Sequence, residues 1–356
     1  MRRLITAVAA AGLALGLATG RASADDLDLS QESSHKQIEA WAKEPIDTAK
    51  YKKDGPYKVG VSAGYLSNSW ILFCSLLLRH EASLHPEVSE VLVTDAAFNP
   101  AKQAADIEDL VSKGVTLLLF WPVDEKSVLP ALQKASEKGV VTINVGYNFM
   151  KSPYVTGNAY VNQWDMTMDG ARRFVDALGG KGKIVAMMPI AGSSAAVVQL
   201  GALKAAIKDK PGIELLSVEY GDWNRAKAKQ LTENLLQRFD HIDGVFSPAA
   251  QMSMGMVEAF EEAGRGGEAI FSPGDEYNGW LKWVKETGKS GSMTSGLPVG
   301  RAAVQHGLAI LKGEAATNGM VVPTRYLSAE EAAKMYQEGR PDDWWPTDLP
   351  ADWLPK

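Results

Sequence analysis

Two lobes of α/β structure, each a doubly wound parallel sheet, are predicted by the pattern of apolar segments in this 356-residue chain. After residue 56, short apolar runs alternate with segments of helical periodicity, which is typical of parallel strands joined by crossover helices. The same alternation starts again after residue 158. The chain length and its 46% hydrophobic composition are sufficient for two separate cores.

Residues 91–124 show one complete strand–helix–strand unit. Residues 91–93 form a short apolar strand, and a polar loop at residues 95–99 follows it. Asn99 is suited to cap a helix, and Pro100 suits the first helical turn. The helix ends at Gly114, and the apolar run after it predicts a strand buried on both faces. The polar loop that follows lies where an open parallel sheet binds its ligand.

The remaining elements follow in order along the chain. In the first lobe we expect strands at residues 58–63, 91–94, 115–120 and 140–145, with helices that begin near residues 69, 100 and 126. In the second lobe we expect helices at residues 165–178, 195–207, 226–239 and 253–263. They alternate with strands at residues 183–189, 213–220, 244–248 and 269–273.

The amino terminus has the composition of a secretory signal peptide at residues 1–24. Arg2 and Arg3 precede a short apolar run, and small residues up to Ala24 offer a cleavage site. Three glycines in and after that run argue against a transmembrane anchor. We therefore expect export to the periplasm of a Gram-negative cell through the inner membrane, with the signal peptide cleaved.

The charge balance excludes two classes of partner. Removal of residues 1–24 changes the formal net charge from −6 to −9, because this segment contains three arginines and no acidic residue. An acidic protein is a poor match for nucleic acid and for anionic membrane surfaces. We expect a monomer that binds neither.

The one cysteine, Cys74, cannot form an internal disulfide and lies in an apolar segment. We therefore expect a buried structural thiol. No cluster of histidine, cysteine or acidic residues has the spacing of metal ligands, so we expect no metal and no cofactor.

One motif raises the possibility of an enzyme. Residues 60–64 match the G-x-S-x-G pattern of α/β-hydrolases, with Ser62 as the nucleophile. That chemistry needs the serine on a sharp turn between strand and helix, whereas Ser62 lies inside the first predicted strand. No histidine has an acidic partner that the sequence reveals. We expect no catalysis, with a serine hydrolase using Ser62 as the remote alternative.

Five motifs in the same order resemble the periplasmic ribose-binding protein and its sugar-binding relatives, the class I periplasmic binding proteins. They lie at residues 58–70, 99–124, 141–144, 189–196 and 221–236, and the resemblance extends over residues 57–315. It implies two lobes joined by a three-stranded hinge, with a ligand cleft between them.

The resemblance also implies a division of the chain. Lobe 1 would comprise residues 57–158 and 297–322, and lobe 2 residues 159–296 and 323–330. Residues 25–56 form an amino-terminal extension, and residues 331–356 form a Trp/Pro-rich tail. We expect the aromatic rings of this tail to dock onto a lobe.

Aromatic and amide side chains gather in the loops that follow the predicted strands, where a ligand would meet both lobes. Aromatic rings suit the C–H faces of sugars, and amides suit their hydroxyl groups. The candidate ligand-binding residues are Tyr65, Asn68, Trp70, Trp121, Asn144, Tyr147, Gln199, Trp223, Gln251 and Asp275. Trp121 equally suits a lobe core or the hinge, and Tyr147 and Gln251 equally suit the rim of the cleft.

The resemblance assigns sugar-binding roles to Asn68, Trp70 and Trp223, and to Asp275 with Glu276 as its alternative. Other positions depart from the family pattern. Asn144 and Val145 stand where the family has Asp and Arg, Gln199 stands in place of a second arginine, Ala249 in place of an asparagine, and Gly296 in place of the hinge glutamine. Neutral groups thus replace charged ones, which favours a neutral polyol, deoxy sugar or small aldose over ribose or an acidic sugar.

The chain thus resembles a periplasmic solute-binding protein of a carbohydrate ABC importer. We expect it to bind a small neutral sugar or polyol, and the resemblance implies delivery to an ABC transporter permease in the inner membrane. The alternative is a periplasmic sensor that presents the bound molecule to a chemoreceptor or a sensor kinase. Neighbouring genes for a permease and an ATPase would favour import, and a kinase gene would favour sensing.

Overall fold

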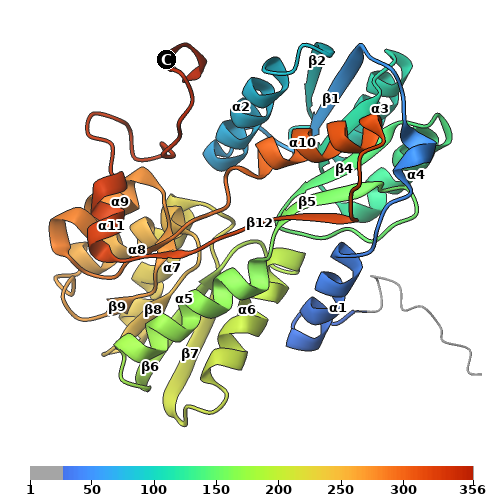
Figure 1. Cartoon of the computed structure of the whole chain (residues 1–356). Helices are drawn as coiled ribbons and strands as arrows, with labels where there is room; N and C mark the ends of the chain where they lie inside the picture. The colour runs from blue at the N-terminus through green and yellow to red at the C-terminus, as the bar shows by residue number, and fades with distance from the viewer. Residues whose placement is uncertain (1–26, 356) are drawn as a thin grey trace, which may run out of the picture.

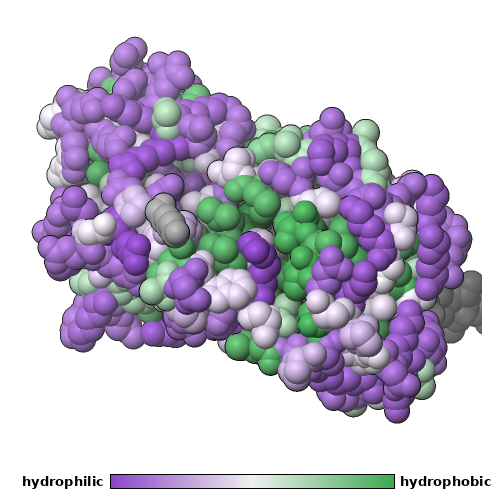
Figure 2. Space-filling model, turned by 90° about the horizontal axis from the view of Figure 1, so that it is seen from above, coloured by the Kyte–Doolittle hydropathy of each residue, from purple (hydrophilic) through white to green (hydrophobic). Residues whose placement is uncertain are grey.

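A computed structural model describes residues 27–355 of the chain. It confirms the predicted architecture of two α/β lobes, which Figure 1 shows side by side. The expected signal peptide at residues 1–24 lies outside the described residues. Within residues 27–355, no helix is long and apolar enough to cross a membrane. Hydrophilic residues dominate the outer parts of the face in Figure 2, and apolar residues gather in its middle.

Lobe 1 contains a six-stranded parallel sheet in the order β12-β5-β4-β3-β1-β2. Its strands are β1 (Tyr57–Ala63), β2 (Val88–Asp95), β3 (Leu117–Trp121), β4 (Val141–Gly146), β5 (Gly157–Val161) and β12 (Gly319–Val322). Its helices are α2 (Ser69–Ser83), α3 (Pro100–Ser112), α4 (Glu125–Glu137) and α10 (Val299–Lys312).

Alternation along β3 shows how helices cover both faces of this sheet. Leu117 and Leu119 pack in one cluster with residues of α2 and α10, whereas Leu118 and Phe120 pack in another with residues of α3 and α4. All five residues of β3 are buried, as predicted for a strand covered on both sides. The expected cap of α3 is also present, because the Asn99 side chain accepts a hydrogen bond from the Lys102 amide at 3.0 Å.

Lobe 2 repeats the design with a four-stranded parallel sheet in the order β7-β6-β8-β9. Its strands are β6 (Lys181–Met188), β7 (Gly212–Tyr220), β8 (Gly244–Phe246) and β9 (Ile270–Phe271). Helices α5 (Gln163–Ala177) and α6 (Ser194–Ile207) cover one face, and α7 (Arg225–Arg238) and α8 (Ala250–Glu262) cover the other. In both lobes the second strand lies outside the first, so each lobe has its topological switch point between its first and third strands.

The sequence analysis did not predict two further helices and a small sheet in lobe 2. The helices are α9 (Asn278–Thr287) and α11 (Ala329–Met335), and the sheet consists of β10 (Gly274–Asp275), β11 (Ser292–Met293) and β13 (Tyr326–Leu327). Three segments connect the lobes: the chain passes from β5 to α5, from β11 to α10, and from β12 to β13.

Both extensions pack on this framework. The amino-terminal extension forms α1 (Glu32–Ala42) and a short 3₁₀ helix, η2 (Thr48–Tyr51). The His35 ring of α1 stacks on Trp164 of α5 with ring centroids 4.6 Å apart. The carboxyl-terminal tail ends in a second 3₁₀ helix, η3 (Ala351–Trp353), and buries Trp344 and Trp345. The rings of the tail dock as expected, and they contact both lobes.

Cys74 is a buried thiol, as predicted, because it lies on α2 where this helix approaches α10 closely. A Cβ atom at Gly300 of α10 would lie 2.3 Å from the carbonyl oxygen of Cys74, so only glycine permits this approach. Burial raises the pKa of the Cys74 thiol far above its ordinary range, which keeps the thiol protonated.

Ser62→Ala should leave both ligand binding and background ester hydrolysis unchanged. Ser62 lies within β1 and is completely buried, and its hydroxyl lies 3.4 Å from the Gln103 amide nitrogen. A substrate therefore has no access to the hydroxyl group. Hydrolysis of p-nitrophenyl acetate by the wild type and the variant checks this expectation. Slower hydrolysis by Ser62→Ala than by the wild type would support the hydrolase alternative instead.

Candidate functional site

A cleft of about 550 Å³ lies between the lobes and is bounded by the loops at the carboxyl ends of the strands. This volume lies in the range of small-molecule sites. Nine of the ten candidate residues line it: Tyr65, Asn68, Trp70, Trp121, Asn144, Tyr147, Trp223, Gln251 and Asp275. The structure therefore brings together side chains that are up to 210 positions apart in the sequence.

Aromatic rings from both lobes form the walls of the cleft. Tyr65 and Phe98 of lobe 1 stack with ring centroids 4.0 Å apart and an interplanar angle of 10°. Phe98 is 52% exposed, so this pair presents an aromatic surface to solvent in the cleft. Trp223 lines the cleft from lobe 2 and holds a left-handed backbone conformation, with φ of 55°.

Trp70 links the cleft wall to the hinge and to lobe 2. Its indole N–H donates to the Ser295 hydroxyl at 3.0 Å, and this hydroxyl donates to Glu276 at 2.9 Å. The Tyr147 hydroxyl donates to the Ser295 carbonyl at 2.8 Å, and the rings of Trp70 and Tyr147 lie 5.0 Å apart. Ser295 lies in the segment between β11 and α10, so one network joins both lobes to a hinge segment.

Two buried carboxyl groups, Asp275 and Glu276, lie side by side at the lobe 2 end of this network. Burial together with the neighbouring Glu276 raises the pKa of Asp275 to about 8, and burial raises the pKa of Glu276 to about 7. Asp275 accepts a hydrogen bond from the Ala250 amide at the start of α8, at 2.9 Å. A carboxyl group in this state can accept or donate a hydrogen bond near neutral pH.

A direct hydrogen bond crosses the cleft. The Asn148 amide of lobe 1 donates to the Ser194 hydroxyl of lobe 2 at 2.6 Å. Because both residues line the cleft, this contact joins the two lobes directly across it.

The sequence model of a protein family, the periplasmic binding protein domain, matches residues 59–315. This chain belongs to that family. The match covers the greater part of both lobes and confirms the resemblance to ribose-binding-type proteins that the motifs indicated. The extension before residue 59 and the tail lie outside the matched segment.

Individual relatives agree with this assignment. The chain is 29% identical over 233 residues to the ribose import binding protein of Bacillus subtilis, covering 64% of this chain and 74% of the relative. It is 28% identical to the xylitol-binding protein of Mycolicibacterium smegmatis over 50% of this chain and 52% of the relative. A Bacillus halodurans ABC transporter solute-binding protein with bound myo-inositol has a TM-score of 0.73 at 21% identity. It covers 79% of this chain, and 98% of that protein is matched, which supports the fold.

Gln199 is the one candidate that does not line the cleft. It is buried on α6, where helical spacing places it on the same face as Ala196 and Leu203. Both of these pack in a cluster with residues of β6, so Gln199 points into lobe 2. Its position after the β6 loop suggested the cleft, but the helix begins at Ser194 and turns residue 199 inward.

Three amide side chains that line the cleft also form hydrogen bonds with the protein backbone. The Asn68 side chain accepts from the Trp70 and Ile71 amides and so caps α2. The Asn144 amide donates to the Asn148 carbonyl at 2.6 Å, and the Gln251 amide donates to the Trp223 carbonyl at 2.6 Å. A ligand therefore has fewer free polar atoms available than a count of amides indicates.

Trp345 also lines the cleft, which the sequence analysis did not predict. The density of tryptophan in the tail indicated docking, but nothing in the sequence placed one of these rings at the cleft. Within residues 27–355, no group of three or more His, Cys, Asp and Glu residues could hold a metal ion.

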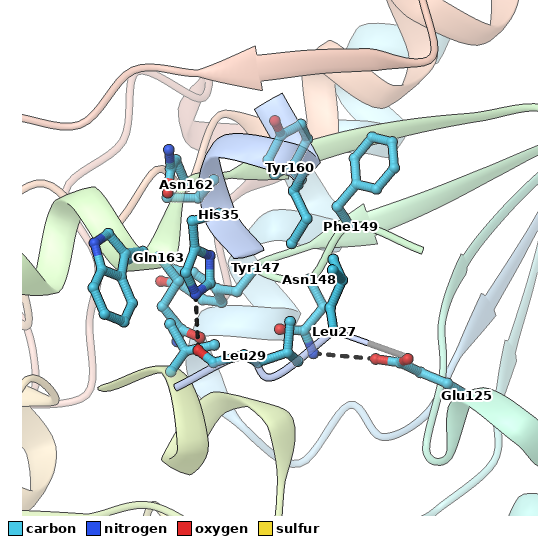
Figure 3. A pocket seen from close by; sticks show the side chains of 14 residues that line it. Leu27, Leu29, His35, Glu125, Tyr147, Asn148, Phe149, Tyr160, Asn162 and Gln163 are labelled. Atoms are coloured by element: carbon cyan, nitrogen blue, oxygen red, sulfur yellow. Dashed lines mark hydrogen bonds between the residues drawn. The ribbon is translucent and has the colours of Figure 1, made fainter. Parts of the chain in front are cut away.

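A smaller cavity of about 70 Å³ lies beside the hinge, under α1 (Figure 3). It shares Glu125, Tyr147 and Asn148 with the cleft. His35 closes part of it and donates a 2.8 Å hydrogen bond to the Leu29 carbonyl, as the dashed line in Figure 3 shows. The amino-terminal extension therefore covers the hinge side of the cleft.

Asp275→Asn should raise stability much more at alkaline pH than at pH 5, which lies near the lower edge of the titration window. Because both carboxyl pKa values lie above the ordinary 3.8 and 4.5, the folded chain binds more protons than the unfolded chain between those values and about pH 8. Stability therefore falls as pH rises through this window. Asparagine keeps the oxygen that faces the Ala250 amide but does not ionise.

Thermal unfolding of both proteins at pH 5 and pH 8.5 measures this effect. We expect the variant to melt roughly 2–4 °C above the wild type at pH 8.5. An equal difference at the two pH values would contradict the proton linkage.

Proposed function

We propose that this protein is the solute-binding component of a carbohydrate ABC importer. It binds a small neutral sugar or polyol in the interlobe cleft and delivers it to a permease in the inner membrane. We further infer that it acts as a monomer in the periplasm. Family membership alone gives neither the class of ligand nor the permease partner, and the proposal adds both.

One observation carries the choice of ligand: aromatic rings of both lobes and neutral amides line the cleft, and among residues 27–355 no arginine does. The one lysine in the lining, Lys126, is exposed and lies beside the acidic lining residues Asp124 and Glu125. Aromatic faces match the C–H faces of sugars, and amides match hydroxyl groups. Acidic sugars and amino acids require a cationic partner, which is usually a bidentate arginine. Relatives named for ribose and xylitol support a neutral carbohydrate.

The mechanism follows from the arrangement of the lobes. A ligand that touches Trp70 of lobe 1 and Trp223 of lobe 2 makes more contacts with the closed protein than with the open protein. Binding therefore shifts the equilibrium between open and closed lobes towards the closed state. Contacts such as Asn148–Ser194 then form between the lobes themselves. The permease would recognise the closed form and draw the lobes apart to release the ligand.

A thermal-shift screen of residues 25–356 tests the proposal. The protein is first unfolded and refolded to remove any ligand bound during purification. The panel comprises D-ribose, D-allose, xylitol, myo-inositol, sugar acids and amino acids. A ligand at a hundred times its Kd stabilises the fold by about 2.7 kcal/mol. A shift with a neutral member supports the proposal, whereas a shift only with acids or amino acids, or with no member, contradicts it.

A further inference from the structure

The tail is fixed to lobe 2 by a dense set of hydrogen bonds. Asn278 at the start of α9 is 1% exposed, and its side-chain amide donates to the carbonyls of Gln337, Arg340 and Pro341, each at 3.2 Å. Its backbone amide donates to the Trp344 carbonyl at 3.0 Å. The Asn278 side chain itself is buried, so breaking these contacts would leave its amide without partners.

An ion pair strengthens the same anchor. Arg225 of α7 lies 2.6 Å from Asp342 of the tail, and it also pairs with Glu258 of α8. Both side chains of the Arg225–Asp342 pair are half-buried, which reduces screening by solvent.

The tail then crosses to lobe 1, where it makes fewer hydrogen bonds. The Trp345 indole N–H donates to the Ser69 hydroxyl at 2.9 Å, and Trp344 meets Phe73 edge-on at 4.9 Å. Further along, Arg301 of α10 pairs with Asp348, whose side chain is 73% exposed. The Arg301 guanidinium donates to both carboxylate oxygens of Asp348, at 2.9 and 2.6 Å. Figure 1 shows the tail leaving α11 and running towards α2.

Trp345 occupies the crossing point and is part of the cleft wall. It lines the cleft together with Trp70, is 2% exposed, and packs edge-on against Tyr277 of lobe 2 at 5.9 Å. Its partner Ser69 lies between Asn68 and Trp70, which both line the cleft. The ring therefore closes one side of the space between the lobes.

We infer that the carboxyl-terminal tail is a fourth connection between the lobes and that Trp345 contacts the bound ligand and limits its size. The tail stays with lobe 2 and separates from lobe 1 when the lobes open, because it makes more hydrogen bonds to lobe 2 than to lobe 1. Closure brings Trp345 back against Ser69 and completes the site. This inference rests on the proposed function for its ligand, but the interlobe connection itself does not.

Titration calorimetry with D-ribose, D-allose, xylitol and myo-inositol tests the ligand contact. Trp345→Ala should weaken binding by about tenfold or more and should change the ratio of Kd values between the larger and smaller probes. Trp345→Phe keeps a ring and should retain most of the affinity. Trp353→Ala is the matched control, because this tail tryptophan packs on His80 of lobe 1 and does not line the cleft.

If Trp345→Ala and the wild type bind the probes equally, the ligand contact is wrong while the proposed function stands. If Trp345→Ala weakens every probe equally, Trp345 does not limit ligand size. If the wild type binds no probe, the proposed function itself fails, and the ligand contact fails with it.

Hydrogen exchange of the ligand-free wild type tests the interlobe connection without any ligand. We expect slow exchange at the amides of Asn278 and Gly279, which donate to the tail, and fast exchange over residues 345–354. Equal exchange in the two regions would overturn the inference that the tail releases lobe 1 and stays with lobe 2.

Discussion

Trp223→Ala should weaken sugar or polyol binding by about a hundredfold, which corresponds to about 2.7 kcal/mol. Its ring is a lobe 2 wall of the cleft and is only half-buried in the closed protein, so its removal exposes little of the core. We therefore expect the melting temperature of the ligand-free variant to stay close to that of the wild type. Binding and folding are thus separable at this position.

Calorimetric titration with the neutral probe that gives the largest thermal shift measures the effect. Trp223→Phe is the conservative control, because it keeps an aromatic face in the same loop and should lose only part of the affinity. Normal binding by Trp223→Ala would show that the β7–α7 loop does not contact the ligand.

Trp70→Ala should abolish binding and also destabilise the ligand-free fold by about 3–5 kcal/mol. The ring is 8% exposed and packs in the lobe 1 core, so its loss leaves a cavity. The substitution also deprives the Ser295 hydroxyl of its indole donor, in a network that contains a buried carboxyl group.

Trp70→Phe distinguishes the two contributions. Phenylalanine retains a ring against Tyr147 but lacks the N–H that binds Ser295. Urea denaturation and titration of both variants should show that the phenylalanine variant recovers most of the stability and less of the affinity. If Trp70→Ala unfolds at the same urea concentration as the wild type, the Trp70 ring does not stabilise the core of lobe 1.

Local signals in the sequence were sufficient to predict most of the helices and strands of the two lobes. Asn99 followed by Pro100 predicted the start of α3, and the apolar run after Gly114 predicted a buried strand. These features depend on contacts between near neighbours and on periodicity, which are visible in one sequence. Because ligands bind at the carboxyl ends of parallel strands, the same framework located nine of the ten candidate residues at the cleft.

Features that depend on contacts distant in the sequence could not be predicted. Asn144 was expected to face a ligand hydroxyl, but its amide nitrogen is also bound to Asn148 and Asn158. Gln199 follows a cleft loop, yet one further turn of helix directs it into the core of lobe 2. Asn278 fixes the tail more than 50 residues away, and no local pattern reveals that contact.

The burial of Cys74 between α2 and α10 makes this chain suitable as a biosensor scaffold. Because no other cysteine is present and this thiol is inaccessible, a cysteine introduced on the surface would react alone with a maleimide dye. Ile190, which is 40% exposed on the lobe 2 side of the cleft, offers such a position. An environment-sensitive fluorophore attached there would report the movement of the lobes directly, with no need to replace a native residue elsewhere.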